Sequence, residues 1–241
     1  MKISAEFITS AAGAADFPHD GLPEVALVGR SNVGKSSLIN ALLRQRVART
    51  SAAPGKTRLA NVYRVARGSS APLYLVDLPG YGYARGGSNE FESLTQEYFS
   101  RGSRLDPPDS QRHETAVRLN PDATGEGDGP AGISALLLVD VRHPGLDSDR
   151  QAWQWLASSI ECHAIVGTKI DKLARGQRIR ALREIESVFE DSVLPVSAVT
   201  GEGLDELWKL IDRLASTRNP INPHRRKRIP LKEMARRRPK K

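Results

Sequence analysis

A glycine-rich segment near the N-terminus holds the residues best suited to chemistry. It reads GRSNVGKSS, residues 29–37, and matches the pattern G-x-x-x-x-G-K-[ST] between an apolar run and a helical pattern. Gly29 and Gly34 let the backbone wrap closely around phosphates, toward which the first amides of the helix point. Lys35 would reach the outer phosphates, and the Ser36 hydroxyl would ligate Mg²⁺. A simple glycine-bearing helix cap would not need the lysine, so the segment predicts a phosphate site.

A threonine in the next loop is a candidate second metal ligand. The loop SAAPGKTRLAN, residues 51–61, lies between the helical pattern and an apolar run. When a third phosphate is bound, Thr57 would close over the nucleotide and add its hydroxyl to the metal shell. An ordinary polar loop is the alternative, and the preceding phosphate site favours the metal ligand.

The segment DLPGYGYA, residues 77–84, would sense the last phosphate. Asp77 ends an apolar run and would hold the metal through water, while the Gly80 amide would contact the third phosphate. Tyr81 and Tyr83 follow in a glycine-spaced loop, where a partner contact is expected rather than core packing.

Two later segments would recognise the base. TKID ends at Asp171, whose carboxylate can accept both N1–H and the exocyclic amine of guanine, a donor pair that adenine lacks. Lys169 would lie against the base, and Thr168 stands where an asparagine is usual. In VSAVTGEG, residues 196–203, a backbone amide at Ser197 or Ala198 would read the guanine carbonyl. The segments together predict guanine nucleotide binding.

Apolar runs and helical patterns alternate along the chain. This order predicts an α/β fold in three layers, with helices on both faces of a mostly parallel sheet and one antiparallel edge strand within residues 61–77. The expected strands are 24–29, 61–66, 72–77, 133–141, 162–169 and 193–198, and the expected helices are 35–45, 90–102, 149–159, 175–190 and 203–217. The tryptophans fall within the helical patterns, where core packing is the default.

Composition indicates a globular protein of the cytoplasm. Of the 241 residues, 39% are hydrophobic and 27% charged, and Cys162 is the single cysteine, which fits a reducing compartment. No run approaches the length of a membrane helix, so no membrane partner is expected.

Positive charge is concentrated at the C-terminal end. Residues 218–241 contain 11 Lys and Arg and one acid, although the whole chain carries a net charge of +8. This basic tail, expected to be disordered or partly helical, favours a polyanionic partner over a merely solubilising role. Residues 104–132, rich in Pro, Gly and Asp, predict a long and mobile surface loop.

Six segments together resemble one family of bacterial GTPases. GRSNVGKSSLINAL, PGKTR, DLPGYGYA, VDVRHPGLDSD, TKID and VSAVTGEG are similar to the EngB family (also called YihA or YsxC), in the Era-like group of TRAFAC-class P-loop GTPases. The resemblance spans about residues 5–217 and implies a six-stranded GTPase domain, expected here at residues 1–217; the tail 218–241 extends beyond the typical domain end, so its role is argued from its charge alone. It also implies Mg²⁺-dependent GTP hydrolysis, assembly of the large (50S) ribosomal subunit, and a need for the protein in normal cell division and septation. Apart from the resemblance, we expect a monomer whose hydrolysis is slow without a partner.

The resemblance also implies the site residues. Lys35, Thr57 and Gly80 would be catalytic, and Ser36, Thr57 and Asp77 would ligate Mg²⁺. The nucleotide-binding residues would be Gly29, Arg30, Ser31, Asn32, Val33, Gly34, Lys35, Ser36, Ser37, Gly55, Lys56, Thr57, Arg58, Leu59, Asp77, Leu78, Pro79, Gly80, Thr168, Lys169, Ile170, Asp171, Val196, Ser197, Ala198 and Val199.

Three features depart from the family or qualify its mechanism. Arg58 stands where the family often has glutamine, and the 104–132 insertion is longer than usual. Tyr81 occupies the place of the glutamine that orients the attacking water in many small GTPases. Asn32 offers a substitute, because in some Era-like GTPases an asparagine here helps to bind K⁺ beside the phosphates; a purely loop-shaping asparagine is the alternative.

The partner expected from these features is the pre-50S particle, contacted through the tail 218–241 and the switch loops in the GTP state. Two alternatives are a GTP-gated protein scaffold in cell division without a ribosomal role, and a P-loop enzyme acting on a small phosphorylated substrate, which TKID disfavours.

Overall fold

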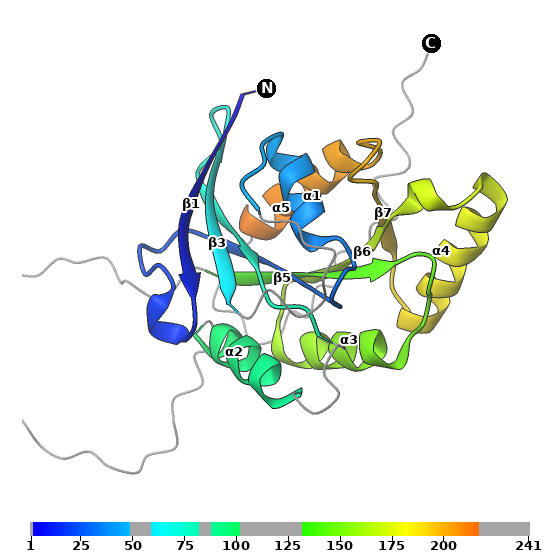
Figure 1. Ribbon diagram of the computed structural model, residues 1–241, viewed down its shortest axis with the longest axis horizontal. Helices are drawn as coiled ribbons and strands as arrows, with labels where there is room; N and C mark the ends of the chain where they lie inside the picture. Colours follow the sequence, from blue (N-terminus) through cyan, green and yellow to red (C-terminus); the bar gives the residue numbers. More distant parts are fainter. Residues whose placement is uncertain (1, 49–58, 82–87, 102–131, 217–241) are drawn as a thin grey trace, which may run out of the picture.

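The computed structural model describes residues 2–48, 59–81, 88–101 and 132–216, with the backbone alone for 88–92. One sheet of seven strands runs through it in the order β1-β3-β4-β2-β5-β6-β7 (Figure 1). The strands are β1 (Ile3–Ala11), β2 (Glu24–Gly29), β3 (Ala60–Arg67), β4 (Leu73–Asp77), β5 (Ile133–Asp140), β6 (His163–Thr168) and β7 (Val193–Pro195). The helices are α1 (Lys35–Leu43), α2 (Ser88–Ser100), α3 (Asp147–Ser159), α4 (Arg175–Phe189) and α5 (Leu204–Ser216), with short 3-10 turns at Ala14–Asp16 and Ile170–Lys172.

The predicted α/β class is confirmed, but the strand count and the edge were wrong. The sheet has seven strands, and its first edge is β1, a segment for which no strand was predicted. β1 pairs antiparallel with β3, and β3 pairs antiparallel with β4, so the antiparallel strand β3 lies inside the sheet. A register shift between Phe7 and Thr9 interrupts the alternation of β1, which removes the period of two that would have marked it as a strand.

Helices cover both faces of the sheet, as expected. α1 and α5 pack on one face, where Trp208 joins the apolar core, and α2, α3 and α4 pack on the other with Trp153 (Figure 1). Trp153 and Trp208 are buried, and the half-buried Trp155 packs against the same core as Trp153, which confirms the predicted core role of all three. None of the helices in the described ranges is long and apolar enough to cross a membrane.

Parallel pairing brings the site residues to one edge. β2 pairs in parallel with β4 and β5, and β5 with β6, so these four strands end on the same side. Their last residues are Gly29, Asp77, Asp140 and Thr168. Ligands of open α/β sheets bind beyond the carboxyl ends of the strands, so this edge is where a nucleotide site is expected.

The turn that leads into α5 requires a glycine. Gly203 has a φ of +80°, and a Cβ placed on it would lie 2.2 Å from the carbonyl oxygen of Pro195. We expect Gly203→Ala to lower the free energy of unfolding by about 2–4 kcal/mol in urea unfolding without nucleotide. Gly176→Ala is the matched control, because a Cβ there meets no atom within 4 Å, and alanine in α4 should raise stability by about 0.5–1 kcal/mol. Equal stability of the two variants would contradict the prediction.

Candidate functional site

The phosphate loop is shaped by its glycines. A Cβ on Gly29 would lie 2.8 Å from the carbonyl oxygen of Leu138, so the loop leaves β2 through a space that only glycine fits. Asn32 and Gly34 have φ values of +63° and +112°, and α1 starts directly afterwards at Lys35. The loop therefore curls over the N-terminus of a helix, where amides and the helix dipole favour an anion.

Lys35 lies across the mouth of this loop. Its side chain is only 8% exposed, and Nζ donates to the carbonyl oxygens of Gly29 at 3.0 Å and Arg30 at 3.4 Å. Burial lowers the pKa of Lys35, and the nearby Asp77 carboxylate opposes that shift. An incoming phosphate would give the ammonium an anionic partner in place of neutral carbonyls.

Ser36 and Asp77 meet at the ends of α1 and β4. The Ser36 hydroxyl donates to Oδ2 of Asp77 at 2.8 Å. Burial raises the pKa of Asp77, while Lys35 and Ser36 work against that shift. Oδ1 of Asp77 is buried and has no hydrogen-bond partner within the described part of the chain. An unpartnered carboxylate oxygen beside a hydroxyl is a donor set that fits Mg²⁺.

A metal here would depend on the nucleotide for further ligands. Within the described ranges, no group of three or more His, Cys, Asp or Glu side chains could hold a metal ion. Mg²⁺ is commonly held by one or two carboxylates together with substrate phosphates and waters, so one aspartate is sufficient.

Gly80 and Tyr81 rest directly on the phosphate loop. The Ser31 amide donates to the carbonyl oxygen of Tyr81 at 3.0 Å, and its hydroxyl donates to that of Gly80 at 3.3 Å. The tyrosine side chain is buried, and its hydroxyl donates to Asp149 at 2.8 Å. The expectation that Tyr81 is unpacked was therefore wrong, because a carboxylate from α3 receives its hydroxyl; Tyr83 lies outside the described residues.

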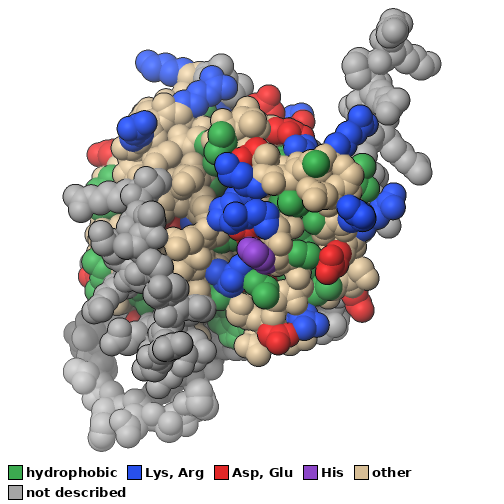
Figure 2. All heavy atoms as spheres, turned by 45° about the vertical axis from the view of Figure 1, so that its right-hand side comes forward, with side chains coloured by type: hydrophobic (Ala, Val, Ile, Leu, Met, Phe, Trp, Pro, Cys, Tyr) green, Lys and Arg blue, Asp and Glu red, His purple; other side chains and the backbone are tan. Residues whose placement is uncertain are grey.

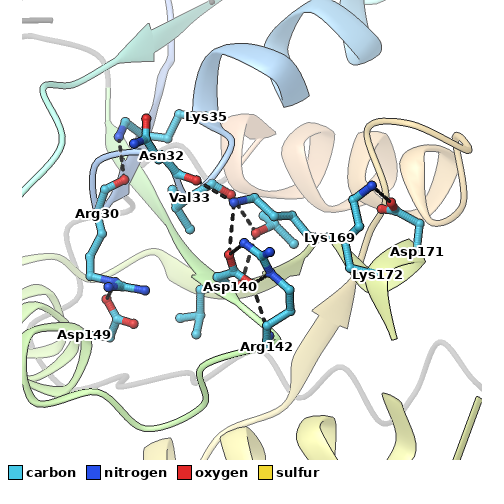
Figure 3. Close-up of polar contacts among 12 residues, drawn as sticks. Arg30, Asn32, Val33, Lys35, Asp140, Arg142, Asp149, Lys169, Asp171 and Lys172 are labelled. Atoms are coloured by element: carbon cyan, nitrogen blue, oxygen red, sulfur yellow. Dashed lines mark hydrogen bonds and ion pairs between the residues drawn. The ribbon is translucent and has the colours of Figure 1, made fainter. Parts of the chain in front are cut away.

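The end of β6, where guanine binding is predicted, is tied to the phosphate loop by two side chains. Thr168 donates its hydroxyl to the carbonyl oxygen of Val33 at 2.8 Å. Lys169, with a φ of +62°, donates from Nζ to the carbonyl oxygen of Asn32 at 2.5 Å and to Asp140 at 3.0 Å (Figure 3). A threonine hydroxyl thus makes the link from β6 to the loop although the usual asparagine amide is missing.

Asp171, the residue predicted to recognise the base, is held in place by a buried serine. The Ser197 hydroxyl donates to Oδ1 of Asp171 at 2.7 Å and accepts from the amides of Val199 and Thr200. Burial alone would raise the pKa of Asp171, but hydrogen bonds from Ser197 and Lys172 outweigh it and lower the pKa. The carboxylate is therefore ionised at neutral pH and can accept two donors from guanine.

The other predicted residues divide into three groups. Leu78, Ile170 and Val196 are fully buried, so they support the loops from beneath. Pro79 is buried as well, whereas Ser37, Leu59 and Val199 are exposed and Ala198 is half-buried at the rim. Gly55, Lys56, Thr57 and Arg58 lie outside the described residues, so their expected roles stay predictions.

Two buried aspartates in the site were missed by sequence reasoning. Asp140 ends β5 and accepts from Arg142 and Lys169 (Figure 3). Asp149 accepts from Tyr81. Both lie in VDVRHPGLDSD, which was noted only as part of a resemblance. Asp140 ends an apolar strand just as Asp77 does, and this was the signal available in the sequence.

Asp140 should make stability depend on pH. Burial alone would raise its pKa, but hydrogen bonds from Arg142 and Lys169 outweigh it and lower the pKa to about 2. A lowered pKa stabilises the fold above the unfolded value near 4, and this contribution is lost as the pH falls toward 2. We expect Asp140→Asn to lower the free energy of unfolding at pH 6 by about 2 kcal/mol and to flatten its decline from pH 5 to 3 in urea unfolding.

Asp147→Asn is the control for this experiment, because that side chain is 82% exposed and its ion pair with Arg150 lies on the surface. The free energy of unfolding of Asp147→Asn should vary with pH as it does in the unaltered protein. Parallel pH profiles for Asp140→Asn and the unaltered protein would refute the assignment.

Positive charge surrounds the edge on which the site lies. Figure 2 brings this edge forward and shows Lys and Arg side chains gathered near the middle of the surface. Arg30, Arg142 and Lys169 are each between about a quarter and two fifths exposed at the site. Such a surface favours an anionic ligand.

The sheet order, the phosphate loop with its lysine, the Ser36–Asp77 pair and the Asp171–Ser197 pair define a P-loop GTPase. A family model described as 50S ribosome-binding GTPase matches residues 24–106. The chain belongs to the EngB family of GTP-binding proteins. A probable GTP-binding protein EngB from Pelotomaculum thermopropionicum is 39% identical over 222 residues, covering 88% of this chain and 96% of that protein. The corresponding protein of Alkaliphilus metalliredigens is 36% identical, over 88% of this chain and 91% of its own length.

Solved structures share the fold. A crystal structure of a probable GTP-binding protein engB has a TM-score of 0.52 and 20% identity, over 80% of this chain and 98% of that one. A structure of Era in complex with MgGDPNP and part of 16S ribosomal RNA has a TM-score of 0.60 and 22% identity, covering 84% of this chain and 60% of that one.

Proposed function

We propose that this GTPase is a conformational switch in assembly of the large ribosomal subunit. In this role the GTP state binds pre-50S particles, and slow hydrolysis to GDP and phosphate releases the protein. The observation that carries the proposal is the match of residues 24–106 to the 50S ribosome-binding GTPase model. The basic tail 218–241 supports it, because clustered Lys and Arg bind RNA phosphates. The proposal places the protein, as a monomer, in the cytoplasm.

The residues of the phosphate loop have distinct roles in this proposal. The ammonium of Lys35 moves from the Gly29 and Arg30 carbonyls to the outer phosphates, where it stabilises charge that develops during hydrolysis. Ser36 and Asp77, with Thr57, would hold Mg²⁺, which would supply positive charge that neutralises the phosphates. The Gly80 amide is directed to the third phosphate, which makes this segment sensitive to GTP.

Asn32 is the proposed K⁺ ligand beside the phosphates. Its side chain is exposed on a loop whose backbone is held by Lys169, so an amide oxygen is available at the mouth of the site. A monovalent cation there would stabilise the negative charge that develops on the phosphates during hydrolysis. It would in this way help a site that lacks the usual water-orienting glutamine. Faster GTP hydrolysis in K⁺ than in Na⁺ at equal ionic strength is expected, and equal rates would remove K⁺ from the proposal.

Co-sedimentation with 50S particles tests the proposed partner. The full-length protein should pellet with the particles in the presence of a non-hydrolysable GTP analogue but not GDP. Deletion of 218–241 should weaken this association and make it less sensitive to salt, while GDP affinity stays unchanged. Failure to pellet in either nucleotide state would reject the ribosomal role and leave a protein scaffold in cell division as the alternative.

A further inference from the structure

A buried carboxylate on α3 connects to the segment that senses the third phosphate. Asp149 is 1% exposed, and Tyr81 is 9% exposed. Oδ1 of Asp149 accepts the Tyr81 hydroxyl at 2.8 Å. The same oxygen lies 3.4 Å from Nε of Arg30 in the phosphate loop (Figure 3). The carboxylate therefore joins three segments: α3, the phosphate loop and the loop after β4.

The backbone on either side of this contact is tightly packed. Arg30 and Tyr81 form a parallel β-bridge, and the Ser31 amide donates to the Tyr81 carbonyl oxygen at 3.0 Å. A Cβ on Gly80 would lie 2.6 Å from the Ser31 amide nitrogen. Gly80 is consequently pressed against the phosphate loop, and a small shift of Tyr81 would move the Gly80 amide.

The Tyr81 hydroxyl is not available for the attacking water. Its proton is donated to Asp149, and burial together with that carboxylate raises the pKa of Tyr81 well above its ordinary value. The phenol therefore stays protonated and can serve neither as a base nor as a copy of the missing glutamine. Its hydrogen bond to Asp149 instead suits a structural role as an anchor, which holds the Tyr81 side chain in place.

The second oxygen of Asp149 is also informative. Oδ2 is buried and has no hydrogen-bond partner in the ranges that the structure describes. Burial of an incompletely satisfied carboxylate is unfavourable, and the pKa of Asp149 is raised mainly for that reason. An apolar side chain would pack at this position without that penalty. The contacts of the carboxylate with Tyr81 and Arg30 therefore account for its presence.

We infer that Asp149 is a positioning residue for GTP hydrolysis, which holds the Tyr81 hydroxyl and thereby fixes the Gly80 amide where the third phosphate of GTP binds. The inference rests on the proposed role of Gly80. This role predicts different effects on GTP and GDP, because GDP lacks the phosphate that Gly80 would contact. Loss of the anchor should impair turnover of GTP and leave GDP binding intact.

Single-turnover hydrolysis and nucleotide titration of four variants test this inference. Tyr81→Phe keeps the ring in its packing and removes only the hydroxyl, and Asp149→Ala removes the acceptor. Each should lower kcat about tenfold or more, since small displacements in a site have effects of that size, while the Kd for GDP changes less than about twofold. Asp149→Asn keeps an oxygen that can accept from the Tyr81 hydroxyl and should retain most of the rate. The double variant Tyr81→Phe/Asp149→Ala should be no slower than the slower single variant, because both changes break the same contact.

Asp147→Ala is the matched control, an exposed carboxylate in the same turn of α3 that pairs with Arg150 on the surface. It should hydrolyse GTP at the unaltered rate. A normal kcat for Tyr81→Phe, or multiplicative losses in the double variant, would overturn the inference. Parallel losses of GDP binding and kcat would also overturn it, because they would indicate a merely structural contact. Absence of GTP hydrolysis by the unaltered protein would instead refute the hydrolytic switch.

Discussion

Lys35→Ala is expected to weaken binding of both GDP and GTP at least about a hundredfold. Nζ of Lys35 donates to the carbonyl oxygens of Gly29 and Arg30, so the ammonium is already placed above the loop where phosphates would bind. A hydrogen bond to a charged group contributes about 1.5–3 kcal/mol, and two such bonds to phosphate oxygens correspond to a factor of about 10²–10⁴ in Kd. Titration with a fluorescent guanine nucleotide measures the loss directly.

The same substitution should leave the nucleotide-free protein almost as stable as before. Burial lowers the pKa of Lys35, which means that the empty fold bears a penalty for holding the ammonium. Its removal offsets the lost packing, and we expect the free energy of unfolding to change by less than about 1 kcal/mol. Saturating GDP should raise the Tm of the unaltered protein and of the control Lys209→Ala, an exposed lysine on α5, but not that of Lys35→Ala. A normal response of Lys35→Ala to GDP would contradict the proposed role.

The parts of the fold and site that could be predicted from the sequence are those specified by local pattern. The long apolar strands β2 and β5 are buried on both faces, so their sequences read as continuous apolar runs. Gly29, Gly34 and Lys35 are fixed in spacing because one turn of backbone must enclose a phosphate, and the structure places Gly29 at the end of β2 and the other two at the start of α1. Local chemistry alone was enough to find this end of the site.

The parts that could not be predicted depend on contacts between distant segments. Strand β1 is recognisable only through its pairing with β3, because its bulge removes the alternating pattern. Tyr81 is buried because Asp149, 68 positions later, accepts its hydroxyl. Thr168 can do without an amide because the carbonyl oxygen of Val33 lies within reach of its hydroxyl. In each case the deciding partner is supplied by the tertiary fold.

Asp171→Asn is expected to change which base the protein prefers. The carboxylate is oriented by Ser197, whose hydroxyl accepts from the amides of Val199 and Thr200 and so directs its single proton to Oδ1 of Asp171. An asparagine must keep its oxygen at the Oδ1 position to receive that proton, which places its NH₂ where Oδ2 was. Lys172, whose Nζ lies 3.4 Å from Oδ2, is 55% exposed and free to move away. The amide would then meet the exocyclic amine of guanine donor to donor, whereas xanthine presents a carbonyl oxygen at the same position.

The expected result is a loss of GDP affinity of about a hundredfold or more, with XDP becoming the tighter ligand, since a site built to accept a donor pair strongly rejects a mismatched edge. Competition titrations with GDP and XDP give the ratio of the two Kd values. The double variant Asp171→Asn/Ser197→Ala is the control: without the Ser197 hydroxyl the amide is free to turn, so guanine and xanthine should be discriminated less than in the single variant. Unchanged preference for GDP in Asp171→Asn would mean that this carboxylate does not read the base. A preference for XDP that survives removal of the Ser197 hydroxyl would mean that another contact orients the side chain.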